Sequence, residues 1–169
     1  MLYVFGGLPA TGKSTLSRRL ADLLGAVHLR IDSIEQALKD QNAMDPVGIA
    51  GYVAAYAVAR DNLVLGRTVI ADSVNPIEIT RAAWRAVATE SGSAFREIEV
   101  FCSDVAIHRQ RYETRVTDID GLTFDGWQSV LDREYEPVAA DVLRIDTATR
   151  TIDEAFAQLR SALNVPDAF

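Results

Sequence analysis

The stretch from Gly7 to Ser14 constrains the fold of this chain more than any other. It reads Gly-Leu-Pro-Ala-Thr-Gly-Lys-Ser and fills every fixed position of the pattern G-x-x-x-x-G-K-[ST]. The run before it, 2–5, is apolar and β-prone, and leucines recur at helical spacing after it. The stretch therefore lies between a strand and a helix, which is where a phosphate-binding loop (P-loop) is found.

Each residue type in this loop has a chemical task. Glycines let backbone N–H groups turn toward phosphate oxygens, and the following helix directs its positive dipole end at the same anion. We expect Lys13 to bridge the β- and γ-phosphates of a nucleotide and the Ser14 hydroxyl to ligate Mg²⁺. The expected nucleotide contacts in this region are Gly7, Leu8, Pro9, Ala10, Thr11, Gly12, Lys13, Ser14 and Thr15.

Length and charge narrow the class of protein. With 169 residues, 49% of them hydrophobic, the sequence predicts one globular domain over 1–169. The formal net charge of −7 counts against a nucleic-acid partner, because Lys and Arg contacts with phosphate dominate that affinity. Cys102 is the only cysteine, which excludes an internal disulfide and a thiolate metal cluster.

The chain carries no sign of a membrane or secretory protein. Its first residues lack the basic region of a signal peptide, and its longest apolar stretch, 47–59, is too short to span a bilayer. We therefore expect a cytoplasmic protein with no membrane partner.

Strand and helix patterns alternate along the sequence, which favours right-handed crossovers and an α/β fold: a parallel sheet with helices on both faces. The β-prone runs are 2–5, 26–30, 68–71, 95–102 and 142–146. The helical segments are the one after the P-loop, one from 33, and those at 47–65, 76–90, 103–115, around 127–135 and 151–163. Their start signals are Ser33 with Gln36, Asp45-Pro46, Pro76, Ser103, and Thr151 with Glu154.

Acidic residues follow several predicted strands. Asp32, Asp72 and Asp146 stand at carboxyl ends, where ligands bind in sheets of this kind. Asp32 is a candidate general base for an acceptor hydroxyl, and the alternative is an acid that stabilises a helix N-terminus. Arg30 shares a strand face with Asp32 and could bind an anionic substrate or pair with Asp32.

Asp72 follows four apolar, β-prone residues, as in a Walker B segment. It is expected to hold Mg²⁺ through water or to orient the acceptor, and the alternative is a cap on the following turn. Asn75 could bind the substrate or simply begin the next helix. His28, expected on a central strand, is typical of a hydrogen-bonded core histidine.

Three arginines lie on one predicted helix. Arg111 and Arg115 are four residues apart and should share a face, and we expect at least one of the arginines, Arg109 included, in the site. The alternative is a solvated face balanced by Glu113. The polar run 116–123 after this helix is expected to be a mobile loop.

Other residues on predicted helices have ordinary interpretations. His108 is expected at the surface or the edge of a pocket. Tyr52 and Tyr56 are at helical spacing and favour packing, although their helix follows Asp32 and could reach the substrate.

The chain resembles the small P-loop kinases, the group that includes chloramphenicol phosphotransferase, gluconate kinase, adenylylsulfate kinase and the kinase domain of polynucleotide kinase. The resemblance covers nearly the whole chain and rests on segments 7–14, 29–32, 69–75, 109–115 and 145–147. It implies a three-layer fold with sheet order 2-3-1-4-5 and a small helical lid at about 105–135. It also implies ATP and Mg²⁺, and transfer of the γ-phosphoryl group to a hydroxyl.

The same resemblance places Asp32 at the acceptor hydroxyl and Thr147 to Arg150 beside the adenine. Together with the residue patterns, it implies catalytic roles for Lys13, Asp32, Arg109 and Arg115. Further nucleotide contacts are expected from Arg109 and Thr147, and a magnesium site from Ser14 and Asp72. The expected substrate contacts are Arg30, Asp32, Tyr56, Asp72 and Asn75.

The sequence departs from individual members of this group. It lacks the paired acids that follow the second strand in polynucleotide kinases, and it carries no gluconate or adenylylsulfate signature. We expect a small hydroxylated acceptor, such as a metabolite, nucleoside or antibiotic, and a monomer or homodimer. The alternatives are a 5′-hydroxyl nucleic-acid kinase and a nucleotide-binding ATPase or switch without an acceptor.

Overall fold

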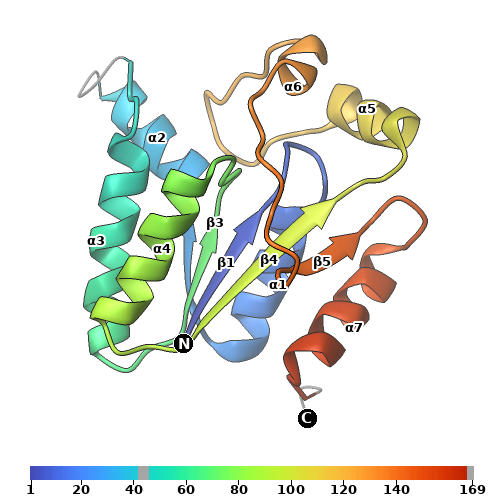
Figure 1. The fold of residues 1–169 in the computed structure, drawn as a ribbon. Helices are drawn as coiled ribbons and strands as arrows, with labels where there is room; N and C mark the ends of the chain where they lie inside the picture. Colours follow the sequence, from blue (N-terminus) through green and yellow to red (C-terminus); the bar gives the residue numbers. More distant parts are fainter. Residues whose placement is uncertain (42–45, 167–169) are drawn as a thin grey trace.

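The structure is a computed structural model that describes residues 1–41 and 46–166. A five-stranded parallel sheet forms its centre, in the order β2-β3-β1-β4-β5, which confirms the predicted order (Figure 1). The strands are β1 (Leu2–Gly6), β2 (Val27–Arg30), β3 (Val69–Asp72), β4 (Phe95–Phe101) and β5 (Leu143–Asp146).

Helices cover both faces of this sheet and one of its ends. They are α1 (Lys13–Leu24), α2 (Ile31–Asp40), α3 (Ala50–Val64), α4 (Glu78–Glu90), α5 (Val105–Thr114), α6 (Gln128–Leu131) and α7 (Ile152–Leu163). Among the helices that the structure describes, none is both long and apolar enough to cross a membrane.

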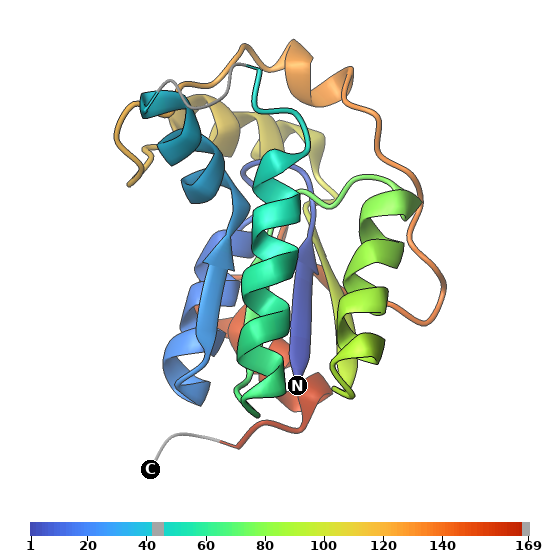
Figure 2. The same ribbon diagram turned by 90° about the vertical axis from the view of Figure 1, so that its left-hand side faces the viewer.

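The two faces of the sheet belong to separate hydrophobic clusters, because successive side chains of a strand point to opposite sides. On β1, Leu2 and Val4 pack toward α3 and α4, which lie side by side in Figure 2. Tyr3 and Phe5 pack toward α1 and α7 on the other face. The result is the three-layer arrangement that the sequence predicts.

The helices α5 and α6 lie above the carboxyl ends of the strands, in the region predicted as a lid (Figure 1). The chain then returns to β5, and the buried Arg81 fixes this return segment. Its guanidinium donates to the backbone carbonyls of Asn75 and Pro76 after β3 and to those of Glu136 and Pro137 in the return segment, at 2.7–3.1 Å. This arginine therefore joins the lid region to the sheet.

The predicted start of α2 is wrong. This helix begins at Ile31, directly after β2, so Ser33 lies inside its first turn and forms no capping box with Gln36. The tight β2–α2 junction leaves no separate capping residue. It also puts Asp32 in the first helical turn, where a negative charge is stabilised by the helix dipole.

The helix cap of α5 is displaced by one residue from its predicted position. The Asp104 carboxylate, and not the Ser103 hydroxyl, accepts hydrogen bonds from the backbone N–H groups of Ala106 and Ile107. The Ser103 hydroxyl instead donates to Asp146, 2.6 Å away. The predicted capping box at the start of α7 is confirmed.

Four other elements are shorter or lie elsewhere than predicted. α3 begins at Ala50, and the proposed start at Asp45 lies outside the described residues. α4 begins at Glu78, since Ile77 is still extended, and the helix predicted around Trp127 has only the four residues of α6. β2 is an edge strand, so His28 is not on a central one.

Candidate active site

The P-loop follows β1 and has a backbone that few side chains tolerate. Gly7 and Gly12 have φ values of 142° and 94°. A Cβ at Gly7 would overlap the carbonyl oxygen of Val100 on β4, so only glycine lets the loop run this close to the sheet. Ala10 has φ 65°, a conformation that is rare outside glycine. Three residues with positive φ thus fall within 7–12, the loop expected to cradle phosphates.

Thr147, predicted to contact the nucleotide, is hydrogen-bonded to the backbone of the P-loop. Its buried hydroxyl donates to the carbonyl oxygen of Thr11, 2.9 Å away. Arg111 on α5 in turn donates to the hydroxyl and to the carbonyl oxygen of Thr147, each at 2.9 Å. These bonds link the P-loop, the end of β5 and the lid helix.

His108 makes a second link between the lid and the P-loop. It is buried and lines a small cavity, so the pocket-edge alternative holds and the surface position does not. Its Nε2 lies 2.7 Å from the carbonyl oxygen of Pro9. Its ring packs edge-on against Trp127, with 5.0 Å between the centroids. A carbonyl partner requires an N–H, so this contact fixes the Nε2-protonated tautomer.

A cavity of about 310 Å³ opens beside the P-loop at the N-terminus of α1. The residues that line it are Ala10, Gly12, Lys13, Ser14, Thr15, Arg18, Arg30, Arg115, Val116 and Asp118. Four of these side chains are cationic and one is acidic, so the cavity suits a polyanion such as a nucleoside triphosphate. The structure places Lys13, Ser14 and Thr15 here, as the sequence predicts.

Asp72 lies opposite Arg30, a lining residue of this cavity, in the register of β2 and β3, and is buried without a hydrogen-bond partner among the described residues. Two residues after Ile70, it points to the α1 side of the sheet. Its side chain is 1% exposed, neither oxygen has a hydrogen-bond partner among the described residues, and the nearest cation candidate, His28 Nε2, is 3.8 Å away. Burial lowers the pKa of His28 against the pull of Asp72, which favours a neutral imidazole.

A buried carboxylate with free lone pairs is costly unless a ligand or water satisfies it. The described residues include no group of three or more His, Cys, Asp or Glu side chains placed to hold a metal. Mg²⁺ suits such a sparse site, because it binds one or two protein oxygens and completes its shell with phosphates and water. The pair Ser14 and Asp72 therefore fits this ion.

Arg30 pairs with the loop after α5 and not with Asp32. Its Nη1 lies 2.7 Å from Asp118 Oδ1, and Arg18 Nη2 lies 2.6 Å from Asp118 Oδ2. The hydrogen bond from Arg30 is the main reason that the pKa of Asp118 falls to about 2. The loop at 116–123, predicted to be mobile, is thus held against the nucleotide cavity by one carboxylate.

The lid arginines separate into different roles. Arg115 lines the nucleotide cavity and lies over the ring of Phe124, 3.6 Å from its centroid. Desolvation lowers the pKa of Arg115, and the charge of Asp32 opposes that effect. Arg115 is therefore near enough to Asp32 for the two charges to interact.

Arg109 does not reach the cavity in this structure. Its side chain is 59% exposed and pairs with Glu113 at 2.8 Å, as the solvated-face alternative expects. The predicted shared face of Arg111 and Arg115 is wrong, because α5 ends at Thr114 and Arg115 follows in extended conformation.

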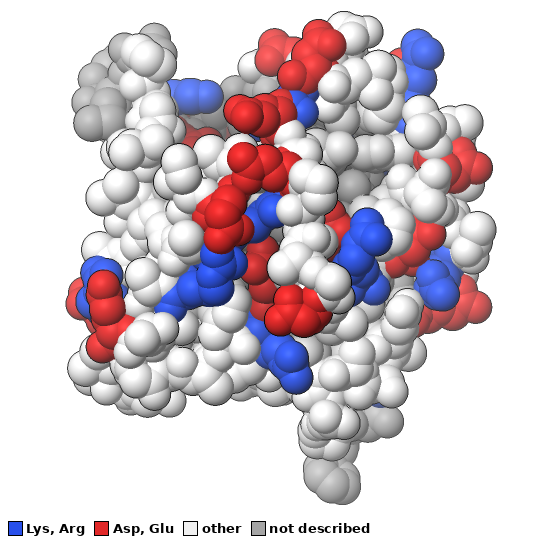
Figure 3. All heavy atoms as spheres, in the orientation of Figure 1, with Lys and Arg blue, Asp and Glu red and all other residues white. Residues whose placement is uncertain are grey.

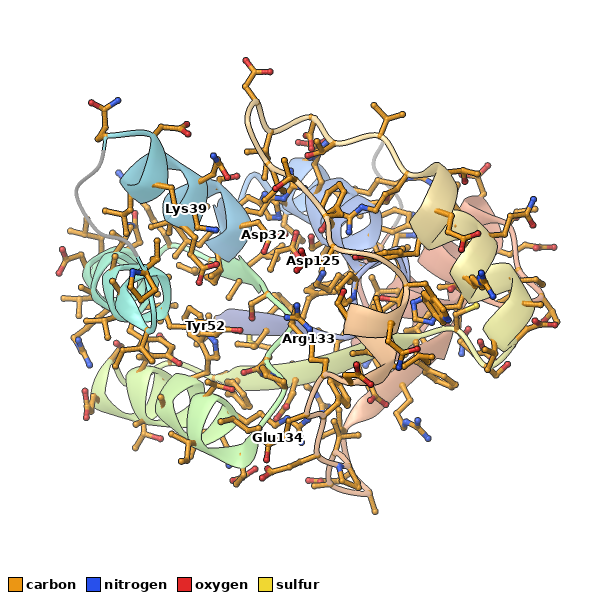
Figure 4. The ribbon with its side chains drawn as sticks, turned by 90° about the horizontal axis from the view of Figure 1, so that it is seen from above. Asp32, Lys39, Tyr52, Asp125, Arg133 and Glu134 are labelled. Carbon is orange, nitrogen blue, oxygen red and sulfur yellow. The ribbon has the colours of Figure 1, made fainter. Side chains whose placement is uncertain are left out.

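A second cavity, of about 300 Å³, lies beside the first at the same end of the sheet. The residues that line it are Ile31, Asp32, Glu35, Gly48, Ile49, Tyr52, Val53, Tyr56, Val74, Pro76, Ile79, Thr80, Ala83 and Arg133. In Figure 4, which looks down on this end, Asp32, Tyr52 and Arg133 surround the same region. Of the predicted substrate contacts, Asp32 and Tyr56 line this cavity, whereas Arg30, Asp72 and Asn75 do not. Their contact with a substrate stays a prediction.

Asn75 supports this cavity indirectly. It is buried, has φ 50°, and its backbone N–H donates to the Tyr52 hydroxyl, 3.0 Å away. Its side-chain amide has no hydrogen-bond partner among the described residues. Tyr56 donates to the Thr80 carbonyl at 3.3 Å, so both tyrosines are held by the turn and helix after β3.

Sequence reasoning missed several residues that the fold brings to the site. Arg18 and Asp118 reach the nucleotide cavity, and Glu35 and Arg133 reach the second one. No motif marks them. Only Glu35 could have been found, because it follows Asp32 by three residues on a helix and so shares a helix face with Asp32.

A comparison with protein-family models matches residues 2–137 to an AAA domain, a family of P-loop NTPases. The chain belongs to this family. Among relatives of this AAA-domain chain are the uncharacterized protein Rv2004c of Mycobacterium tuberculosis and its counterpart in Mycobacterium bovis. Each is 30% identical over 179 aligned positions, which cover 96% of this chain and 35% of the relative. The chain therefore spans about a third of their length.

Solved structures show that this AAA-domain chain has the P-loop kinase fold. A kinase candidate from Chloroflexus aurantiacus has a TM-score of 0.72 at 20% identity, covering 96% of this chain and 95% of that one. The APS kinase CysC of Mycobacterium tuberculosis, in complex with AMPPNP and APS, has 0.67 at 20%, covering 96% of each chain. Kti12 of Chaetomium thermophilum, with ADP-AlF3, has 0.68 at 21% and full coverage of both.

Proposed function

We propose that this protein is an ATP- and Mg²⁺-dependent kinase that transfers the γ-phosphoryl group to a hydroxyl of a small molecule. The observation that carries the proposal is that consecutive residues line two cavities, with Arg30 in the first and Ile31 and Asp32 in the second. The first cavity is cationic and formed by the P-loop, and the second is largely apolar and is lined by three charged side chains, Asp32, Glu35 and Arg133. A kinase needs such a pair, whereas an ATPase needs only the first.

The reaction follows from the positions of these side chains. The acceptor oxygen attacks the γ-phosphorus, the bond to the β-phosphate oxygen breaks, and ADP leaves. Asp32 accepts the proton of the acceptor hydroxyl, and Lys13 and Arg115 stabilise charge on the phosphoryl oxygens. Ser14 and Asp72 would hold Mg²⁺, which neutralises phosphate charge when bound.

Arg18 and Arg30 add positive charge on the side of the cavity that faces Asp118. Arg109 and Thr147 remain proposed contacts to the nucleotide base, Arg109 only after movement of the lid. Two of the similar structures are consistent with this function, since one contains AMPPNP and the other ADP-AlF3.

Lys13→Ala tests the nucleotide half of this proposal. A charge-assisted contact with phosphate is worth about 1.5–3 kcal/mol, so ATP affinity should fall by about 10- to 100-fold in calorimetric titration. Lys39→Ala is the matched control, because Lys39 is the other lysine of the sequence and lies on α2. Wild-type ATP affinity in Lys13→Ala would contradict the assignment.

A further inference from the structure

The second cavity has apolar walls that extend to its mouth. Ile49, Val53 and Ile79 line it and are 75%, 54% and 77% exposed, which is unusual for large aliphatic side chains. Tyr52 and Tyr56 form the inner wall, with 6.1 Å between their ring centroids. Walls of this kind bind apolar surface and offer few partners to a polyol.

The size of the cavity limits the ligand. Its volume of about 300 Å³ is at the lower end of known ligand pockets and equals the liquid volume of about ten water molecules. A molecule with one ring and a short hydroxylated chain would fill it. A dinucleotide or an oligonucleotide end would not fit inside.

Three charged side chains line this apolar space without a partner. Among the described residues, no hydrogen bond or ion pair within 4 Å engages the side chain of Asp32, Glu35 or Arg133. Burial raises the pKa of Glu35, and the charge of Asp32 raises it further, while Lys39 and Arg133 lower it. Asp32 and Glu35 are partly buried, whereas Arg133 is exposed. Partly buried charges without partners are costly, so a ligand that satisfies these two carboxylates gains affinity.

A glycine makes the room that Glu35 occupies. Gly51 lies in the first turn of α3, and a Cβ there would overlap Glu35 Cγ and lie 2.9 Å from Glu35 Oε1. Its φ is not in the left-handed region, so the backbone does not require glycine at this position. Glycine is a poorer helix former than alanine. The close contact with Glu35 is the reason the structure offers for it.

We propose that the acceptor is an alcohol with an apolar, ring-sized body and a second hydrogen-bond donor, with its hydroxyl toward Asp32 and the second donor bound by Glu35. The inference rests on the proposed kinase function and names its substrate class. A sugar acid is a poor fit, because most of its hydroxyls would lose water against apolar walls.

A matched set of compounds tests this substrate class. Phenylalaninol and 3-phenylpropane-1,2-diol carry a ring, a hydroxyl and a second donor, 3-phenylpropanol lacks the second donor, phenyllactate adds a carboxylate, and gluconate lacks the ring. With ATP and Mg²⁺, we expect ADP release to be stimulated most by the first two. We expect kcat/KM to be about 10- to 100-fold lower for 3-phenylpropanol, since a hydrogen bond to a charged group is lost.

Variants test the role of Glu35. Glu35→Ala should raise KM for the diol by about 10- to 100-fold with little change in kcat, and should leave 3-phenylpropanol unchanged. Gly51→Ala should raise the same KM without weakening the fold, because it improves the helix while displacing Glu35. In a Glu35→Ala background, Gly51→Ala should have no further effect on KM. Equal losses for both alcohols would indicate a structural role and overturn the assignment of Glu35.

Melting temperature and turnover distinguish a wrong substrate class from a wrong kinase function. If ADP raises the melting temperature but no aryl alcohol raises it further or stimulates turnover, the substrate class is wrong and the nucleotide site stands. Gluconate as the best substrate would likewise overturn the substrate class and leave the nucleotide site standing. If neither ATP nor ADP changes the melting temperature, the kinase proposal itself fails.

Discussion

Asp32 and Asp72 are both acids near strand ends, but their surroundings differ. Asp72 is nearly inaccessible and has no hydrogen-bond partner among the described residues, whereas Asp32 lines a cavity from the first turn of α2. A carboxylate that lines an open cavity can take a proton from the hydroxyl of a bound substrate. A buried carboxylate is better placed to hold a hydrated ion. The two roles in the proposed reaction follow from this difference.

Asp32→Asn should separate binding from chemistry. Asparagine keeps the size of the side chain but cannot accept the proton of the hydroxyl, so turnover should fall by about 10²–10⁴-fold with ATP affinity nearly unchanged. Asp61→Asn on α3 is the control. If Asp32 only stabilises the helix N-terminus, the cost should be about 0.3–1 kcal/mol of stability and turnover should survive. Steady-state kinetics with thermal unfolding would separate these cases.

Asp72→Asn should stabilise the protein while impairing its reaction. An amide is cheaper to bury than a carboxylate without partners, so in EDTA and without nucleotide we expect the free energy of unfolding to rise by about 1–3 kcal/mol. Mg²⁺-dependent ATP turnover should fall. Denaturant unfolding and a magnesium titration would measure both. A destabilised variant with normal magnesium dependence would contradict the proposed role of Asp72.

The loop at 116–123 is the element whose behaviour matters most for access to the nucleotide cavity. Its contacts with the body of the protein include Asp118, bonded to Arg18 and Arg30, and Gly121, where a Cβ would come within 2.9 Å of Gln36 Nε2. The mobility expected from its polar sequence stays a prediction. The ion pairs of Asp118 are the contacts that would limit this mobility.

Asp118→Asn should loosen this loop. Trypsin should cut more quickly after Arg115, because the substitution removes the charge of two ion pairs. The pair with Arg18 is exposed and worth below about 1 kcal/mol, whereas Arg30 is largely buried. ATP with Mg²⁺ should protect both proteins if the lid closes on nucleotide. Gel electrophoresis would measure the cleavage rates. Equal rates for wild type and variant would show that Asp118 does not hold the loop.

The pH dependence of this contact has a definite sign. The pKa of Asp118 is lowered to about 2 in the folded protein, so the carboxylate contributes full stability above the unfolded value near 4. That contribution is lost as pH falls through about 2. Protection of the Arg115 site should therefore stay constant between pH 5 and 8. A decline across that range would require another titrating group.

The elements differ in how far they could be predicted. The sheet order was available from the family resemblance, and the P-loop from its motif. The start of α2 was not, because the backbone passes from strand to helix without a capping residue. The second cavity depends on Glu35 and Arg133, which are about a hundred residues apart and meet only through tertiary packing. No local pattern in the sequence encodes such a meeting.

At the scale of the whole molecule, charge limits the choice of partner. The net charge is −7, and the face shown in Figure 3 has acidic and basic side chains interspersed, with no broad basic surface. We therefore predict that a 5′-hydroxyl oligonucleotide binds weakly even at about 50 mM salt, measured by fluorescence anisotropy. Tight binding that weakens steeply with salt would instead support the nucleic-acid kinase alternative.

The distinction between phosphoryl transfer and hydrolysis decides between a kinase and an ATPase. Phosphorus NMR of the protein with ATP, Mg²⁺ and the aryl alcohols separates a phosphate monoester from inorganic phosphate in one spectrum. We predict a monoester resonance that grows in step with ADP, requires the alcohol, and is lost in Lys13→Ala. Inorganic phosphate alone, formed at the same rate with and without alcohol, would contradict the kinase function.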